Sequence, residues 1–391
     1  MVEKKNILFV VPTMNSGGVE VGMVEFAKKN YETKDLNLFL ASSGGLLINK
    51  LTHYGVKCFN LNIKSKNPLV MLNNVKKLKK IIKNEAIDIV QVESRAPAWS
   101  CYYACKSLKI PLINIVQFNG IFKKSSILKK LYNSAMLKGD RVIAVSNAVK
   151  VAIVNNYKIF LGGIRKGNRK IVDIVHRGID TDVYNQKNVN ENRKLTLQSK
   201  LKLPDDKIII TLPARFTEQK GQKYFLKVLK NLKYENYMCI MVGDTKKNPE
   251  YVREIEKTIY RYHLENNVKI YEDINDMPSL YALSNIIVSP SIVPEAFGRI
   301  SIEAQSMEKI FVGTNIGGIL ETVVDGKTGF LASPKDPIAF ASILDNIINM
   351  DQDTLDKIRK NARNNILENY TFDIMYNKML EIYKSFDKVN I

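Results

Sequence analysis

Residues 289–304 read Ser289-Pro-Ser-Ile-Val-Pro-Glu295-Ala-Phe-Gly298-Arg299-Ile-Ser-Ile-Glu303-Ala304, and this stretch decides the fold of the second half of the chain. A strand-like apolar run over residues 285–290 leads into it, and a helix-like run over residues 300–307 follows the glycine. The order of strand, glycine turn and helix is typical of a βα unit in a doubly wound parallel sheet.

The same stretch predicts an anion site between two carboxylates. The first helical turn offers unpaired backbone N–H groups and the positive end of the helix dipole to a phosphate. Glu295 precedes that turn, and Glu303 lies about one turn inside the helix. A pyrophosphate held between two hydroxyl-binding carboxylates suits a nucleotide-sugar. The alternative is an ordinary glycine turn with surface glutamates, because two glutamates at this spacing are common by chance.

Length and composition indicate a globular protein with two domains. The chain has 391 residues, 45% of them hydrophobic, and no apolar run of about 18 residues that would predict a membrane-spanning helix. The N-terminal apolar run is too short for a signal peptide and is expected to be a buried first strand. The four cysteines form no CxxC pair and have no histidine cluster beside them, so we expect buried thiols of a cytoplasmic protein and no metal.

The net charge of +20 is concentrated in the first half of the chain. Residues 1–190 contain 31 Lys and Arg against 12 Asp and Glu, a net charge of +19, whereas residues 191–391 contain 28 against 27, a net charge of +1. A compositional preference for lysine would not leave one half neutral. A basic face on one domain predicts an acidic partner, which is nucleic acid, anionic lipid or a phosphorylated acceptor.

Strands and helices alternate along both halves. Strand-like runs cover residues 6–12, 36–41, 55–60, 87–92, 111–117 and 141–145, and the pattern restarts at 207–213 after a polar stretch over 185–202. Such alternation predicts parallel, doubly wound sheets. We therefore expect an N-terminal domain over residues 1–185, a C-terminal domain over residues 186–369, and a final helix in residues 370–391.

Two cations follow the first predicted strand of the second domain. Arg215 and Lys220 lie in Leu-Pro-Ala-Arg-Phe-Thr-Glu-Gln-Lys-Gly, residues 212–221. Loops at the carboxyl ends of strands are where α/β folds bind ligands. Two cations there can clamp a diphosphate and stabilise it as a leaving group. A solvated pair at a helix start is the alternative interpretation.

Together these segments closely resemble the Glu-x7-Glu signature of retaining glycosyltransferases of the GT-B type, and most of all glycosyltransferase family four, also called group 1. The resemblance extends over essentially the whole chain and is strongest in the second half. It implies an α/β fold of two Rossmann-like doubly wound parallel-sheet domains facing a cleft, with the final helix returning to the first domain. Residues 94–100, 132–134 and 139–147 resemble lipopolysaccharide-core glycosyltransferases in particular.

The resemblance also implies roles for individual residues. Glu295 would contact the transferred sugar, and Arg215 and Lys220 would neutralise the departing diphosphate. Residues 273–281 resemble the segment whose backbone reads the base, and Gly317 and Gly318 resemble a glycine element that we interpret mainly as a turn. The implied donor-binding residues are Gly17, Gly18, Gly243, Phe297, Gly298, Arg299 and Glu303.

The acceptor side departs from the family pattern at one position. Members usually carry a histidine in a Phe-His-Gly element, whereas residues 117–120 here read Gln-Phe-Asn119-Gly. An asparagine can still hydrogen-bond a sugar as donor and acceptor, and the retaining mechanism usually proposed for the family needs no histidine base. Arg95 follows a predicted strand and could hold a phosphorylated acceptor or simply begin a helix.

A lysine-rich segment could touch a membrane. Residues 121–138 place Lys123, Lys124, Lys129 and Lys130 among apolar and aromatic residues at helical spacing. That pattern suits a helix lying on an anionic bilayer. It equally suits a helix that packs on the core with a solvated lysine face, although the uneven charge favours membrane contact.

The sequence therefore predicts an enzyme that transfers a hexose from a nucleotide-sugar, expected to be a UDP-sugar, to a glycolipid acceptor in lipopolysaccharide or other envelope glycan synthesis. The nucleotide-sugar is a substrate, and neither a cofactor nor a metal is expected. Nucleic acid is not expected as a partner, and the protein is expected in the cytoplasm, peripheral to the inner face of the membrane. The alternatives are a GT-B nucleotide-sugar epimerase, or a non-enzymatic protein that binds anionic lipid or RNA.

Overall fold

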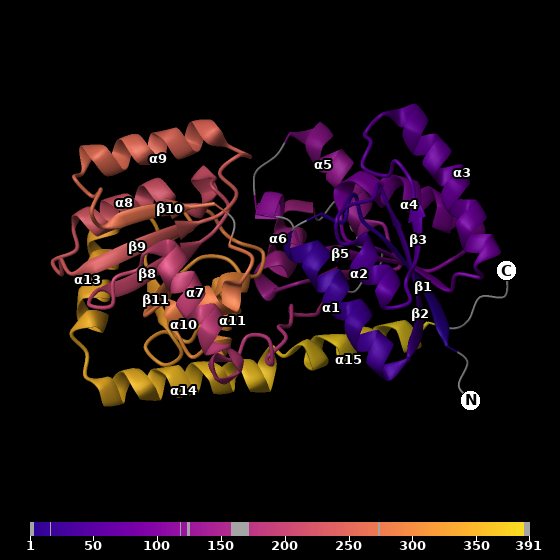
Figure 1. Cartoon of the computed structure of the whole chain (residues 1–391). Coiled ribbons are helices and arrows are strands. Elements are labelled where there is room, and N and C mark those ends of the chain that lie inside the picture. The colour runs from indigo at the N-terminus through magenta and orange to yellow at the C-terminus, as the bar shows by residue number, and fades with distance from the viewer. Residues whose placement is uncertain are drawn as a thin grey trace. The chain divides into compact units, whose positions relative to one another are not determined.

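The structure is a computed structural model that describes residues 4–15, 17–117, 119–122, 126–157, 172–272 and 274–386, apart from the side chain of Asn119. The chain forms two compact units, each built on its own sheet (Figure 1). The first unit comprises Met1–Arg177 and Phe372–Ile391, and the second comprises Gly178–Thr371.

The first unit contains a seven-stranded sheet in the order β3-β2-β1-β4-β5-β6-β7, with every pair of neighbouring strands parallel. Its central strands are buried on both faces, which is why they read as continuous apolar runs in the sequence. The strands are β1 (Lys5–Val10), β2 (Leu36–Ser42), β3 (Lys57–Asn60), β4 (Ile89–Val92), β5 (Leu112–Val116), β6 (Arg141–Ala144) and β7 (Val172–Ile174).

Helices connect these strands as crossovers, which a parallel sheet requires. They are α1 (Gly18–Thr33), α2 (Ile48–His53), α3 (Pro68–Asn84), α4 (Arg95–Leu108), α5 (Ile127–Asn133), α6 (Asn147–Tyr157) and the 3₁₀ turns η1 (Asn119–Phe122) and η2 (Ser134–Leu137). The C-terminal helix α15 (Phe372–Lys384) also belongs to this unit, where the hydroxyl of Tyr383 donates to Gln91 Oε1 at 2.5 Å.

The second unit contains a six-stranded parallel sheet in the order β10-β9-β8-β11-β12-β13. The strands are β8 (Ile208–Pro213), β9 (Tyr237–Val242), β10 (Val268–Tyr271), β11 (Ile286–Ser289), β12 (Ile310–Thr314) and β13 (Phe330–Ala332). The helices are α7 (Glu191–Leu201), α8 (Gln222–Lys230), α9 (Pro249–Arg261), α10 (Met277–Leu283), α11 (Arg299–Ser306), α12 (Ile319–Thr322), α13 (Pro337–Ile348) and α14 (Gln352–Asn369), with η4 (Gln186–Asn188) and η5 (Glu218–Lys220).

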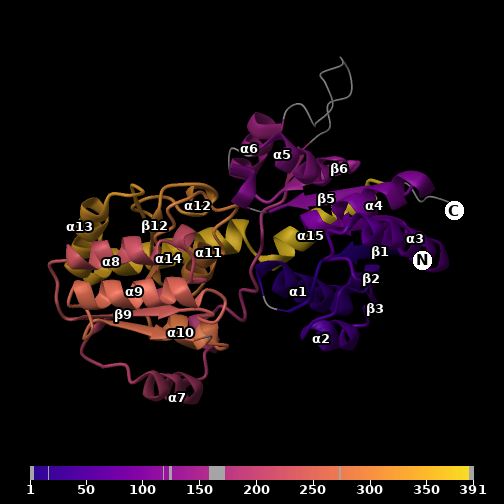
Figure 2. The same ribbon diagram turned by 90° about the horizontal axis from the view of Figure 1, so that it is seen from above.

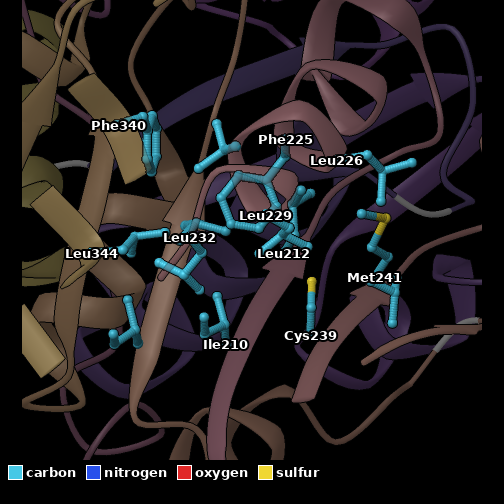
Figure 3. Packing of buried hydrophobic residues seen from close by; sticks show 14 of the residues in the cluster. Ile210, Leu212, Phe225, Leu226, Leu229, Leu232, Cys239, Met241, Phe340 and Leu344 are labelled. Carbon is cyan, nitrogen blue, oxygen red and sulfur yellow. The ribbon is translucent and has the colours of Figure 1, made fainter. Parts of the chain in front are cut away.

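Both faces of the second sheet are covered, because alternate side chains of each strand point to opposite faces. On one face, Ile210 and Leu212 pack in one cluster with residues of α8 and α13 (Figure 3), and the same cluster includes buried residues of α9. Helices α8 and α9 lie side by side over this face (Figure 1, Figure 2). On the other face, Ile209 and Met238 pack against α7 and α10. This two-sided burial leaves the loops at the strand ends as the accessible part of the sheet.

Residues 178–185, which the sequence analysis assigned to the first domain, belong to the second unit. Ile179 donates its backbone N–H to Tyr370 O at 3.0 Å and forms a parallel bridge with Thr371. The guanidinium of Arg363 donates to the carbonyl oxygen of Thr181 at 3.0 Å. The end of α14 therefore holds this segment, and the chain divides after Arg177 rather than after residue 185.

Candidate functional site

The second sheet reverses its strand order between β8 and β11. These strands are neighbours in the sheet, but β9 and β10 lie between them in the chain, so the loops that follow them turn to opposite faces. Ligands of open α/β sheets bind at such a switch point, outside the carboxyl ends of the strands. The loop after β8 carries Lys220 and the loop after β11 carries Glu295, both predicted as site residues.

Backbone contacts fix the two loops to each other. Ile292 donates its N–H to Gln219 O at 3.0 Å. Gly221 adopts a φ of +74°, and a Cβ at this position would collide with the carbonyl oxygen of Pro290. Only glycine combines this left-handed backbone with so close an approach. The glycine after Lys220 therefore positions the lysine against the second loop.

Lys220 and Glu295 form a buried ion pair. The Lys220 Nζ lies 2.7 Å from Glu295 Oε2, and the two side chains are 15% and 10% exposed. The other oxygen, Oε1, accepts hydrogen bonds from the hydroxyls of Ser291 and, at 3.4 Å, Ser289. The carboxylate is thus held from both sides by groups of the same two loops.

Glu295 is a stable anion in this setting. Burial alone would raise its pKa, but the charge of Lys220 and the hydrogen bonds from Lys220, Ser291 and Ser289 outweigh burial, so the pKa lies below its ordinary value. At neutral pH the group is ionised and accepts hydrogen bonds. It can therefore bind sugar hydroxyls or stabilise developing positive charge.

Two glycines of the loop after β12 hold the Glu295 backbone. Gly318 donates its N–H to Glu295 O at 2.9 Å, and Glu295 and Gly317 form a parallel bridge. A Cβ at Gly317 would meet the backbone of Glu295, and the φ of Gly317 is +68°. The interpretation of these glycines as turn residues was incomplete, since they also position the carboxylate. The sequence signal for this role was the Gly-Gly pair itself.

Glu303 lies within α11 and is 8% exposed. Its Oε1 accepts from Arg299 Nε at 2.8 Å, four residues earlier on the same helix. Its Oε2 accepts from the hydroxyl of Tyr281 at 2.7 Å. Sequence reasoning grouped Glu303 with Arg299 but gave Tyr281 no part in holding it.

Gly298 begins the turn into α11. Its φ is +88°, and its carbonyl oxygen accepts from Ser301 N at 3.0 Å and Ser301 Oγ at 2.7 Å. The ring of Phe297 packs 5.9 Å from that of Tyr370, centroid to centroid. Phe297 therefore contributes its side chain to packing, and a ligand at this turn would meet backbone groups.

Arg215 lies in the loop after β8, the loop that also carries Lys220, and Gly243 packs against the same loop. Arg215 is exposed, and its side chain makes no hydrogen bond or ion pair within the described ranges of the chain. Gly243 follows β9, and a Cβ there would collide with Ala214 O in the loop after β8. Arg215 is thus a solvent-exposed cation on the same loop as the paired Lys220.

In the first unit, the predicted residues lie at the carboxyl ends of its strands. Gly17 and Gly18 are exposed at the start of α1, just after β1. Arg95 begins α4, after β4, and its Nη1 lies 3.5 Å from Asn133 Oδ1. Asn119 is in η1 after β5, but its side chain lies outside the described part.

A buried polar cluster behind these loops was missed by sequence reasoning. Glu93 is 8% exposed, and its Oε2 accepts from Arg177 Nη2 at 2.6 Å and from Gln117 Nε2 at 2.9 Å. Gln91 Nε2 donates to the other oxygen of Glu93 at 2.8 Å. This cluster fixes Gln117, two residues before Asn119. In the sequence, the cluster was indicated only by the polar residue Glu93 at the end of an apolar strand.

The lysine-rich segment is described only in part, since Lys123 and Lys124 lie outside the described residues. Lys129 and Lys130 are on α5. On α5, Ile127 is 81% exposed and Leu128 is 79% exposed, whereas Ile121 before this helix and Met136 and Leu137 after it are buried. The predicted segment therefore packs on the domain at both ends and exposes apolar side chains on α5 between them.

Within the described ranges, no helix is long and apolar enough to span a bilayer. In the same part of the chain, no group of three or more His, Cys, Asp or Glu side chains is placed to hold a metal ion.

Comparison with known proteins identifies both units. Residues 194–365 match the family model described as Glycosyl transferases group 1, and residues 16–183 match the model described as Glycosyltransferase Family 4. The structure is similar to that of a glycosyltransferase from Rickettsia africae, with a TM-score of 0.86, 37% identity and coverage of 97% of this chain and 98% of that chain.

Two further proteins are similar at lower identity. The capsular polysaccharide biosynthesis glycosyltransferase CapM of Staphylococcus aureus is 27% identical over 268 residues, which are 68% of this chain and 67% of CapM. The fold also matches Anabaena HepE, solved in complex with UDP and glucose, with a TM-score of 0.83, 21% identity and coverage of 98% of this chain and all of HepE. The predicted GT-B fold of two Rossmann-like domains is confirmed, and the chain belongs to the group 1, or family four, glycosyltransferases.

Proposed function

We propose that this glycosyltransferase moves a hexose from a nucleotide-sugar, with UDP as the nucleotide, to a glycolipid acceptor, and that the anomeric configuration is retained. The observation that carries the proposal is the arrangement of Lys220, Glu295 and Glu303 around the switch point of the second sheet. It brings one cation and two ionisable carboxylates to the place where a doubly wound sheet receives a nucleotide.

Each group has a role that fits its surroundings. Glu303, close to the start of α11, would accept hydrogen bonds from the ribose hydroxyls. Lys220 and the solvent-exposed Arg215 would neutralise the diphosphate as the bond to the sugar breaks. Glu295 would hold the hydroxyls of the transferred hexose. Because Lys220 is paired with Glu295 before the donor arrives, the diphosphate would share the lysine with that carboxylate.

Retention follows from attack on the face that the leaving group vacates. The sugar–phosphate bond breaks with its electron pair moving to the phosphate oxygen, and the acceptor oxygen bonds to the anomeric carbon from the same side. The departing phosphate takes the acceptor proton, so no histidine base is needed and Asn119 is compatible with activity. NMR of the product tests this step, since a β-linked product from an α-linked donor would overturn it.

The choice of donor is supported by relatives. The HepE structure contains UDP and glucose, and CapM is named for capsular polysaccharide biosynthesis. Envelope polysaccharides are assembled from nucleotide-sugars, and a basic first half suits an anionic acceptor: its net charge is +19, from 31 Lys and Arg against 12 Asp and Glu in residues 1–190. We therefore place the acceptor among phosphorylated or lipid-linked glycans.

A thermal-shift screen of UDP-, GDP- and ADP-sugars tests the donor assignment. A ligand that binds only the folded state raises the melting temperature by mass action. We expect a shift with UDP-sugars that Glu303→Ala abolishes and that Glu254→Gln, a change in an exposed ion pair of the same unit, leaves intact. A shift with GDP- or ADP-sugars alone would overturn the assignment of UDP, and no shift with any of them would overturn the proposed function.

We further propose that the first unit contacts an anionic membrane, which would make the protein peripheral to the cytoplasmic face. Helix α5 exposes Ile127, Leu128 and Leu131, the last at 48%. Helix α4 contributes Tyr103 at 52% exposure, and Trp99 on the same helix donates Nε1–H to Tyr132 O at 3.1 Å. Exposed apolar side chains among lysines are typical of a surface that lies in a lipid interface.

Vesicle sedimentation tests this contact. Protein should sediment with phosphatidylglycerol vesicles and less with phosphatidylcholine vesicles, and added salt should release it. Burial of an apolar side chain in the lipid would contribute roughly 1.5–3 kcal/mol to the free energy of binding. A variant with both Ile127→Ser and Leu128→Ser should therefore bind the vesicles about 10-fold or more weakly. Leu46→Ser is the matched control, since Leu46 is 84% exposed in the same unit but lies outside α3, α4 and α5. Equal binding of both variants would contradict the proposal.

A further inference from the structure

The hydroxyl of Tyr281 reaches Glu303, the predicted ribose carboxylate. Tyr281 lies on α10 and is fully buried, with 0% of its surface exposed. Its hydroxyl donates to Glu303 Oε2 at 2.7 Å. The ring of Tyr184 packs against it in an edge arrangement, with the ring centroids 6.1 Å apart, and so restricts its orientation.

The position of Tyr281 excludes direct contact with a nucleoside base. Residues 273–281 resemble a base-binding segment, but a side chain with no exposed surface cannot stack on a ligand. Its hydroxyl proton is directed to a carboxylate that itself retains 8% exposure. Tyr281 therefore acts on the ligand site only through Glu303.

The two donors on Glu303 leave a defined set of free lone pairs. A carboxylate offers about four acceptor positions on two oxygens. Arg299 occupies one position on Oε1 and Tyr281 one on Oε2, each at 2.7–2.8 Å. Both donors are held by packing or by the helix, so the carboxylate plane cannot rotate freely. The remaining lone pairs then have a fixed direction, as recognition of two adjacent hydroxyls requires.

We propose that Tyr281 is a positioning residue for nucleotide recognition: by holding Glu303 Oε2, it makes the site select a ribose over a deoxyribose. This inference rests on the proposed function, in which Glu303 binds the ribose hydroxyls. A site built to hydrogen-bond a hydroxyl strongly rejects the analogue that lacks it, because its polar groups are then left unpaired. That selectivity requires the carboxylate to be aimed, and Arg299 alone holds only one of its two oxygens.

Calorimetric titration with UDP and with 2′-deoxy-UDP tests the proposal. The wild type should bind UDP at least about 10-fold more tightly than the deoxy nucleotide, in line with a hydrogen bond to a charged group. Tyr281→Phe keeps the ring and removes only the hydroxyl, and we expect the preference to fall to about 3-fold or less. Tyr376→Phe removes a buried hydroxyl of the first unit, which donates to Asn30 Oδ1 at 3.1 Å, and should keep the wild-type preference.

The possible outcomes distinguish a failure of the proposed function from a failure of the role proposed for Tyr281. If the wild type binds neither nucleotide, the proposed function fails, and this inference fails with it. If the wild type prefers UDP and Glu303→Gln loses that preference while Tyr281→Phe retains it in full, the function stands and the role of Tyr281 is refuted. A general loss of stability does not imitate the expected result, because it would weaken both nucleotides alike and leave their ratio unchanged. Melting temperatures of each variant verify folding, and Tyr281→Met supplies a second variant without the hydroxyl.

Discussion

Replacement of Lys220 by methionine should destabilise the second unit far more than loss of an ordinary surface lysine. The substitution keeps most of the aliphatic length but removes the ammonium that lies 2.7 Å from Glu295. Glu295 is only 10% exposed at its side chain, so water compensates poorly for the lost partner. The variant therefore contains a buried carboxylate without its counter-charge.

The magnitude can be worked from this geometry. Two unit charges at 2.7 Å attract by roughly 6 kcal/mol at an effective dielectric constant of about 20. Desolvation of both groups offsets part of this energy, and removal of one partner from a buried pair costs about 3–5 kcal/mol. The hydroxyls of Ser291 and Ser289 remain bonded to the carboxylate, so we expect the lower end, about 3 kcal/mol.

Urea unfolding followed by far-ultraviolet circular dichroism measures the effect. Lys223→Met is the matched control, because Lys223 pairs with Glu254 at the same distance of 2.7 Å in the same unit, but the two side chains are 39% and 54% exposed. Its loss should cost less than about 1 kcal/mol. Lys220→Met combined with Glu295→Gln should recover most of the lost stability, since no unpaired charge then remains. Equal effects of Lys220→Met and Lys223→Met, or no recovery in the double variant, would refute the reasoning.

Three further outcomes follow from the same loops. The pKa of Glu295 is lowered from 4.5, so its ionised form stabilises the fold above that pH, and this stabilisation is lost as the pH falls through the lowered value. The difference in urea midpoint between the wild type and Glu295→Gln should therefore be constant near neutral pH and shrink below about pH 4.5. Gly221→Ala should lower the melting temperature strongly, at a cost of at least about 1–3 kcal/mol, because φ is +74° and the new Cβ meets Pro290 O; a thermal scan that matches wild type would contradict this. Arg215→Ala should change the free energy of unfolding by no more than about 0.5 kcal/mol while it reduces the turnover of the nucleotide-sugar. An unchanged turnover number in steady-state kinetics would remove Arg215 from the catalytic group.

Periodicity predicted most of the sheet elements because buried parallel strands are continuous apolar runs. The strands expected over 36–41, 111–117 and 141–145 match β2, β5 and β6 to within one residue at each end. The stretch over residues 185–202 was interpreted as a polar connection, yet it contains α7. Only Leu197 and Leu201 of that helix are buried, which gives too narrow an apolar stripe to stand out from the polar background.

The site was predictable as a set of residues but not as a set of contacts. Glu295 and Lys220 are 75 positions apart in the chain, and only the β8–β11 pairing brings their loops together. The involvement of Tyr281 could not be read from spacing, because its contact with Glu303 joins two helices on one face of the sheet. Exposure of Ile127 was likewise undecided, since the same helical pattern serves a core or a membrane.

Equilibrium titration with the nucleoside diphosphate selected in the screen tests most directly that the second unit holds the donor. The wild type should bind at a single site, Lys220→Met and Glu303→Gln should each bind at least about 10-fold more weakly, and Glu254→Gln should bind as the wild type does. Absence of binding by the wild type, or binding of the two site variants with wild-type affinity, would contradict the account.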